Sequence, residues 1–259
     1  MNKVEHYRQM LKTLDDWDSF LLQESGLPGQ RANLELVQAV ADEGDEPLFR
    51  RLLSFGPDQA PTNSPHEFLA LCGVVGLGRL LAEGQTEVLE TLRQCASDPR
   101  WRIREGVAMA LQRLGEADMD ALLQAMAKWS EGNPLEKRSA AAALCEPRLL
   151  RAREHAQRTL QMLDRITRSV GGASADERRR DDFRVLRQAL GYCWSVAVAA
   201  LPEEGQAALE KWFSSDDADV RWIMRENLRK QRLVRVDAAW VARWKAYLSN
   251  CSFHKSVLK

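Results

Sequence analysis

The chain has 259 residues, 45% of them hydrophobic, which is enough for one large domain or two small ones with a sizeable core. Its 37 basic and 37 acidic side chains cancel, which excludes the bulk charge of a histone-like or membrane-surface protein, so any nucleic-acid site would have to be local. The five cysteines are too widely spaced for a CxxC metal site or a dense disulfide framework. These features predict a cytoplasmic protein without a metal or a cofactor.

The N-terminal 22 residues contain several acidic side chains and lack the basic and apolar regions of a signal peptide, so they predict an amphipathic helix. The longest uncharged runs, residues 68–78 and 188–202, are shorter than the ~18 apolar residues that span a bilayer. They predict buried core helices and no membrane association. Glycines at 73, 76 and 78 lie inside the first run and not after a strand, which favours close helix packing over a phosphate-binding loop.

Turn signals recur every ~15 to 25 residues, and the segments between them have the length of helices. Those segments are rich in Ala, Leu, Arg, Glu and Gln and show no sustained apolar–polar alternation. The sequence therefore predicts an all-α protein. Residues 1–65, which end in a long proline-rich connection, predict an atypical helical N-terminal capping region.

Residues 98–115 predict an amphipathic helix with one buried face, because Ile103, Val107 and Leu111 fall on a single stripe. Asp98 is the expected N-cap, and Pro99 the first helical residue. Similar capped starts follow at Asn133-Pro134 and at 215–217. By contrast, residues 171–182 predict a flexible loop with solvated arginines.

Each capped start is followed by a basic residue near the first helical turn. The marker arginines Arg104, Arg138, Arg184 and Arg221 are spaced 34, 46 and 37 residues apart, within the period of helical-pair repeats. This pattern of Asp, turn, Val or Ile and Arg, followed by an Ala/Leu-rich helix, resembles the HEAT-repeat family. The resemblance implies a right-handed α-solenoid of HEAT-like helical pairs over residues 66–250, with structural Asp/Arg ladders, and a C-terminal tail at 251–259.

Two tryptophan–glutamate pairs, Trp101 with Glu105 and Trp222 with Glu226, stand at i,i+4 spacing and therefore on one helix face. Arg104 or Arg225 lies beside each pair. The combination is similar to the HEAT-like alkylpurine DNA glycosylases, whose concave face uses tryptophans, an acidic residue and arginines to hold DNA around a damaged base. It implies an alternative groove formed by Trp101, Arg104, Glu105 and Glu226. Tryptophans that fill the seams between repeats are the competing interpretation.

Charge is unevenly distributed along the chain. Residues 1–97 carry a net charge of −7, and residues 221–259 a net charge of +8. On a helix predicted over residues 219–232, basic side chains lie within an arc of about 80° with a tryptophan at its edge. The predicted partner-binding residues are Arg221, Trp222, Arg225, Arg229 and Arg232.

These observations favour a non-enzymatic interaction scaffold that binds an acidic macromolecular partner, a protein or a peptide, through a concave or basic C-terminal surface. The alternative is a DNA-binding protein related to the HEAT-like glycosylases, since a local +8 segment is sufficient for a small duplex footprint. Self-association between the acidic N-terminal third and the basic end is a third expectation. A solvated face without a partner is the competing interpretation of the arginine stripe.

Overall fold

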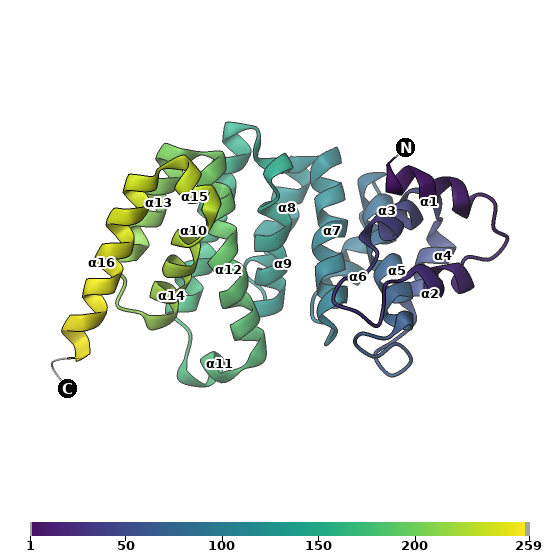
Figure 1. Ribbon diagram of the computed structural model, residues 1–259, viewed down its shortest axis with the longest axis horizontal. Coiled ribbons are helices and arrows are strands. Elements are labelled where there is room, and N and C mark those ends of the chain that lie inside the picture. The colour runs from purple at the N-terminus through teal and green to yellow at the C-terminus, as the bar shows by residue number, and fades with distance from the viewer. Residues whose placement is uncertain (1, 257–259) are drawn as a thin grey trace. The chain divides into compact units, whose positions relative to one another are not determined.

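The computed structural model describes residues 2–256, with side chains described through residue 249, and these residues form helices and contain no strand. The predicted all-α class is confirmed. The chain divides into two compact units, residues 1–118 (unit 1) and 119–259 (unit 2) (Figure 1). The predicted boundaries at 65/66 and 250/251 stay predictions, and residues 257–259 of the predicted tail lie outside the described residues.

Unit 1 is built around one long buried helix, α5. Its helices are α1 (Lys3–Leu11), α2 (Asp18–Glu24), α3 (Leu34–Glu43), α4 (Glu46–Leu53), α5 (Pro65–Ala82), α6 (Val88–Cys95) and α7 (Trp101–Ala117). Helix α5 packs against α2, α3, α4, α6 and α7. By length and composition it could cross a membrane, but 78% of its apolar window is buried inside the protein. Its apolar residues therefore form the core of unit 1, as the sequence predicts.

Glycines in α5 allow its neighbours to approach closely. A methyl group on Gly73 would lie 2.5 Å from the backbone nitrogen of Leu53 in α4. A methyl group on Gly76 would overlap the ring of Phe49, and one on Gly78 would overlap the backbone of α7. Close helix packing, predicted for these glycines, is confirmed.

The turn before α7 differs from the prediction. Helix α7 begins at Trp101, and Asp98 does not cap it. The carboxylate of Asp98 instead accepts a hydrogen bond of 2.8 Å from the backbone nitrogen of Arg100 and pairs with its guanidinium at 2.8 Å. Arg100 is buried and also donates to the carbonyl oxygen of Phe55 at 2.8 Å. The turn is therefore fixed to the long 54–64 connection, a contact that local sequence signals do not reveal.

Unit 2 is built around another long helix, α12. Its elements are α8 (Met119–Trp129), α9 (Pro134–Leu144), the short 3₁₀ helix η1 (Pro147–Leu150), α10 (Arg153–Gly171), α11 (Ala175–Arg179), α12 (Asp181–Ala200), α13 (Pro202–Phe213), α14 (Ala218–Leu228), α15 (Gln231–Val236) and α16 (Ala238–Ser256). Helix α12 packs against α9, α10, α13, α14 and α15. The predicted capped starts are confirmed at Asn133, which caps α9, and at Asp217, which caps α14.

Polar side chains fix the neighbours of α12. Trp194 is fully buried, and its indole nitrogen donates to the hydroxyl of Thr167 in α10 at 2.9 Å. The buried amide of Asn227 in α14 accepts from the backbone nitrogen of Ser195 and donates to the carbonyl oxygen of Leu190, both at 2.8 Å. Because Trp194, Thr167 and Asn227 are buried and hydrogen-bonded to one another's helices, these bonds set the positions of α10 and α14 on α12.

Glycines and arginines in residues 171–182 predicted a flexible loop, and the structure shows that this prediction is wrong. These residues contain α11, which begins with a capping box in which Ser174 and Glu177 each satisfy the other's backbone nitrogen. Arg178 pairs with Asp217 at 2.8 Å and with Asp219 at 2.6 Å, across to the start of α14. The prediction of solvated charge was wrong for Arg178 because its acidic partners lie about 40 residues away in the sequence.

The helix predicted over residues 219–232 is interrupted. Helix α14 ends at Leu228, and α15 begins at Gln231. Leu228 and Leu233 are both buried. In one continuous helix, residues five apart point about 140° from each other, so one of the two would face solvent. The break lets both leucines reach the core, and it separates the predicted arginine stripe.

Candidate functional site

Two marker arginines hold the turns that precede their helices. Arg104 donates to the carbonyl oxygen of Asp98 at 2.6 Å and to that of Pro99 at 2.9 Å. Arg221 makes the same pair of bonds, to Ser215 at 3.0 Å and to the next residue, Asp216, at 2.8 Å. Matching geometry at matching offsets places Arg104 and Arg221 at equivalent repeat positions. Both guanidinium groups are therefore already engaged in holding the backbone.

Trp222 packs at the edge of an ion-pair cluster. The guanidinium carbon of Arg187 lies 4.4 Å from the centre of the Trp222 ring, and Arg187 pairs with Asp219 at 2.5 Å. Burial raises the pKa of Asp219, but hydrogen bonds from Arg187 and Arg178 outweigh it and leave that pKa below its usual value. This cluster joins α11, α12 and α14, so half-buried Trp222 contributes to packing within unit 2.

The remaining residues of the predicted stripe are dispersed. Arg225 is half-buried, whereas Arg229 has a 69% exposed side chain and pairs with Glu226 at 2.5 Å. Arg232 belongs to α15, where it stacks on the ring of Tyr192 at 4.6 Å and donates to its hydroxyl. These contacts supply partners that the sequence did not reveal. The partner-binding role of the stripe stays a prediction.

The structure does form a basic groove, with Arg232 at one side. The groove has a volume of about 500 Å³ and lies among η1, α12 and α15. The lining residues are Pro147, Leu150, Arg151, Val196, Ala199, Ala200, Arg232 and Arg235. The lining therefore combines an apolar floor with three arginines, and it includes no acidic side chain. We call it the arginine groove.

Two arginines of this groove differ from every other arginine in the chain. The chain has 28 arginines, all within residues 2–249, whose side chains the structure describes. Within that range, only the side chains of Arg151 and Arg235 make no hydrogen bond, ion pair or ring contact. Both are exposed, and both line the arginine groove. The two arginines without a side-chain partner thus line the same groove.

An exposed aromatic side chain extends this surface. Tyr192 is 46% exposed. Besides the stacked guanidinium of Arg232, the ammonium nitrogen of Lys230 lies 5.8 Å from the centre of its ring. Cations beside an exposed tyrosine are typical of the contact residues that dominate protein interfaces.

A second groove of unit 2 has the opposite character. It holds about 390 Å³ between α10 and α13, and Asp164, Glu204 and Lys211 contribute to its lining. Its acids are already engaged, since Asp164 accepts from Trp212 at 3.1 Å and Glu204 pairs with Arg153. Both carboxylates of this groove are therefore already paired with groups of the protein.

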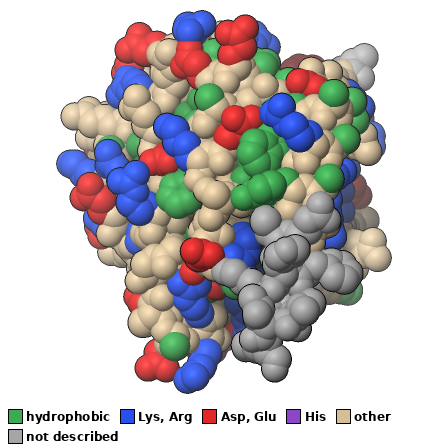
Figure 2. Space-filling view, turned by 90° about the vertical axis from the view of Figure 1, so that its left-hand side faces the viewer, with side chains coloured by type: hydrophobic (Ala, Val, Ile, Leu, Met, Phe, Trp, Pro, Cys, Tyr) green, Lys and Arg blue, Asp and Glu red, His purple; other side chains and the backbone are tan. Residues whose placement is uncertain are grey.

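An aromatic cluster lies between α13 and the C-terminal helix α16. The carboxylate of Glu210 accepts from the indole nitrogens of Trp240 at 2.7 Å and Trp244 at 3.0 Å. The ring of Tyr247 lies 5.3 Å from Trp244 and is 41% exposed. Figure 2 views unit 2 from the side of α16 and shows hydrophobic side chains surrounded by basic and acidic ones. The cluster holds α16 in place and leaves part of one aromatic ring in solvent.

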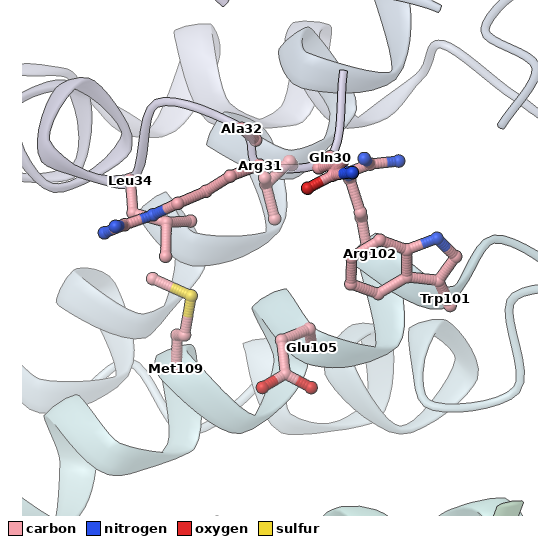
Figure 3. A pocket seen from close by; sticks show the side chains of 9 residues that line it. Gln30, Arg31, Ala32, Leu34, Trp101, Arg102, Glu105 and Met109 are labelled. Carbon is pink, nitrogen blue, oxygen red and sulfur yellow. The ribbon is translucent and has the colours of Figure 1, made fainter. Parts of the chain in front are cut away.

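In unit 1, the first predicted tryptophan–glutamate pair lines a small pocket (Figure 3). Trp101, Glu105 and Met109 come from α7, and residues 30–34 form the opposite wall. The pocket holds about 90 Å³, and Trp101 is 47% exposed. The second predicted pair, on α14, belongs to unit 2.

A buried ion pair supports this pocket. Arg102 pairs with Glu67 at 3.1 Å, and their side chains are only 5% and 0% exposed. Arg102 also donates to the carbonyl oxygen of Gly29 at 2.8 Å and stacks at 4.4 Å on Trp101. These contacts attach the 26–33 connection to α5 and α7. Arg102, which the sequence did not single out, therefore shapes the pocket from below.

Burial suppresses the acidity of three of the cysteines whose side chains the structure describes. Burial raises the pKa of Cys72 and Cys145 well above the usual thiol value, and it raises that of Cys95 to about 11. Such thiols are poor nucleophiles at neutral pH. Among the described residues, no group of three or more His, Cys, Asp or Glu is placed to hold a metal ion.

Comparison with known proteins identifies the repeat. Residues 74–145 match the family model of HEAT repeats. Solved structures that the chain matches include an engineered protein from the Northeast Structural Genomics Consortium, with 16% identity, a TM-score of 0.37 and coverage of 88% of this chain and 95% of that one. A designed armadillo repeat protein has 15% identity, a TM-score of 0.33 and coverage of 84% and 100%. No curated protein sequence matches the chain.

Residues 74–145 therefore resemble HEAT repeats, as the marker residues Arg104 and Arg138 indicate. The family match includes the turn and helix that carry Arg104 and ends at the C-cap of α9. The resemblance to the glycosylases stays a prediction. Neither Arg151 nor Arg235 was recognisable from sequence, because nothing in a linear pattern shows which arginines find an acidic partner in the fold.

Proposed function

We propose that the chain is a non-enzymatic interaction scaffold that binds an acidic macromolecular partner through the basic side chains of unit 2. The observation that carries this proposal is that Arg151 and Arg235, the two arginines without a partner, line the same groove as Arg232. Like charges that share a site repel one another, and this groove contains no acid to relieve the repulsion. A bound anionic segment would supply the missing charge.

The predicted stripe belongs to the same proposal. Arg232 lines the arginine groove, and Arg229 is largely exposed and would strengthen the basic field around it. Arg221, Trp222 and Arg225 contribute mainly through the +8 charge of residues 221–259, since their side chains are half-buried. A basic field of this kind speeds association with an acidic partner and weakens as salt is added.

Binding of a labelled poly-L-glutamate to the full chain tests this function. We expect binding that weakens as salt is raised, and a loss of at least ~10-fold in affinity for Arg151→Glu/Arg235→Glu, since two attractive contacts become repulsive. Arg179→Glu/Arg184→Glu makes the same charge change at exposed, ion-paired positions on α11 and α12 and is the matched control. Equal losses in both double variants, or no binding by the wild-type chain, would contradict the proposal.

A second candidate function is DNA binding with excision of an alkylated base. The pocket of unit 1 favours it specifically, because an exposed Trp101 ring and the Glu105 carboxylate line one cavity. Such a pair would stabilise a cationic alkylated nucleoside by stacking and by charge. The test is incubation with DNA that contains N3- or N7-alkylpurines, alongside an active glycosylase. This candidate predicts base release that Glu105→Gln abolishes, and no release above background would remove it.

We propose a cytoplasmic location as well. Four cysteines with described side chains, Cys72, Cys95, Cys145 and Cys193, are free thiols, which suits a reducing compartment. Cell fractionation with a tagged full chain tests the location. Recovery of the protein in an oxidising compartment would overturn it.

A further inference from the structure

We infer that the arginine groove binds a peptide segment in which acidic side chains flank an apolar one. This inference rests on the proposed function and names the chemistry of the partner. It follows from three features of the groove: the apolar floor, the origin of its arginines in different elements, and the adjoining exposed tyrosine.

The floor of the groove is apolar, whereas its rim carries the charged arginines. Leu150 and Val196 are buried beneath it, and Pro147, Ala199 and Ala200 complete the surface. A partner made of charge alone would leave this floor in contact with water. An apolar side chain that covers the floor removes that surface from water, which favours binding. The floor thus selects for a partner with an apolar group.

The arginines are placed to receive separate carboxylates. Arg151 follows η1, whereas Arg232 and Arg235 stand at i,i+3 on one face of α15. The apolar residues of η1 and α12 line the same groove. Because Arg232 is engaged with Tyr192 and the other two arginines are not, Arg151 and Arg235 are the groups that need a carboxylate. One acid for each, with an apolar residue between them, matches this arrangement.

The exposed tyrosine favours the same class of partner. Tyr192 carries a stacked arginine and a nearby lysine, so its ring offers a rigid apolar surface next to positive charge. Tyrosine and arginine dominate the energetics of protein interfaces. A nucleic-acid backbone would use the cations but not the alanine, proline and leucine floor. We therefore favour a peptide.

The test is selection of random dodecapeptides on the immobilised full chain, with counter-selection on Arg151→Glu/Arg235→Glu. We expect the recovered peptides to be enriched in Asp or Glu on both sides of a Leu, Ile, Met or Phe. A synthetic peptide of that pattern should lose at least ~10-fold in affinity with the double variant. It should also lose affinity with Ala200→Trp, which fills the groove without changing its charge. Arg179→Glu/Arg184→Glu should leave the affinity within about twofold, since it keeps the groove intact.

Other outcomes separate this inference from the proposed function. If poly-L-glutamate binds through Arg151 and Arg235 but no acidic–apolar peptide is enriched, the acidic partner stands and the peptide chemistry is overturned. Tighter binding of a 12-base-pair duplex than of any selected peptide, lost in the same double variant, would overturn it in favour of nucleic acid. Self-association at low salt that the double variant abolishes would overturn it in favour of a second copy of this chain.

A last control separates binding from stability. The C-terminal end of α12 carries partial negative charge, and nearby arginines stabilise such an end. Thermal unfolding of the double variant therefore accompanies the binding assay. A lowered melting temperature with unchanged peptide affinity would show that these arginines serve the helix and not a partner, and would overturn the inference.

Discussion

Units 1 and 2 are each organised around one long helix, but they use charge differently. In unit 1, every described arginine has a partner, and one of them, Arg102, forms a buried ion pair beneath α5 and α7. In unit 2, arginines pair with acids around α11 and α14 but remain unpaired at Arg151 and Arg235. The net charge of a segment therefore does not show which of its side chains are paired, because pairing depends on the residues that pack around each one.

The packing of the two central helices also differs. Helix α5 contacts its neighbours through glycines, with no room for a methyl group at Gly73 or Gly76. Helix α12 is held by polar bonds from Asn227 and Trp194. Unit 1 should therefore respond most strongly to changes in volume and to loss of its buried ion pair, and unit 2 to loss of hydrogen bonds.

The largest expected effect is on the buried ion pair of unit 1. Arg102→Met should lower the free energy of unfolding of unit 1 by about 3–5 kcal/mol, because it leaves Glu67 buried without its counter-charge. Hydrogen exchange of peptides from each unit, with chemical denaturation, measures the change. Arg178→Met in unit 2 is the matched control, since its more exposed pairs should cost about 1 kcal/mol. Equal destabilisation by both variants would contradict the expectation that unit 1 depends more strongly on its ion pair than unit 2 does.

The next effect concerns volume. Gly73→Ala should destabilise unit 1 by about 3 kcal/mol, because the added methyl group would lie 2.5 Å from backbone atoms of Leu53 that have no room to move. Gly191→Ala in α12 is the counterpart in unit 2. There the nearest atom, in the ring of Trp222, lies at 3.1 Å, so a small shift should relieve the contact at a cost of about 1 kcal/mol or less. Thermal unfolding of both variants tests whether α5 is the more tightly packed helix.

The third effect concerns hydrogen bonds in unit 2. Asn227→Ala should cost about 2 kcal/mol, because it removes a buried amide that bonds the backbone of both α12 and α14. Denaturation with hydrogen exchange should show faster opening of α14 and unchanged exchange in unit 1. If exchange in α14 were unaffected, the amide would not be what joins these helices.

The smallest expected effect depends on pH. Hydrogen bonds from Arg187 and Arg178 lower the pKa of Asp219, although burial opposes them. A carboxylate whose pKa is lowered in the folded state stabilises that state at any pH above its pKa in the unfolded chain, which is near 4. This stabilisation is lost as the pH falls through the pKa of the carboxylate in the folded state. Asp219→Asn should therefore cost about 1 kcal/mol at pH 7.

The difference in melting temperature between the wild-type protein and Asp219→Asn should become smaller as the pH is lowered towards 3. Melting temperatures of both proteins between pH 3 and pH 7 measure it. A difference that stays constant over this range would mean that Asp219 does not titrate with the folding of unit 2.

Local signals in the sequence predicted much of the fold. The helix class, the caps at Asn133 and Asp217 and the close packing at Gly73 and Gly76 all depend on residues near one another in the chain. The HEAT resemblance follows from the same short patterns, and the match over residues 74–145 confirms it. The predicted cap at Asp98 was wrong, because Asp98 pairs with Arg100, which in turn donates to the 54–64 connection.

The sequence by itself determined the helices and the repeated pattern of capped helix starts followed by an arginine. It also determined the concentration of positive charge after residue 220. It also placed Trp101 and Glu105 on one face, which the unit 1 pocket confirms. Only the tertiary structure decided which arginines have partners: Arg178 found acids about 40 residues away, and Arg151 and Arg235 found none. Helical spacing is a property of adjacent turns, whereas ion pairing depends on how distant helices pack, so the arginine groove could be recognised only in the folded chain.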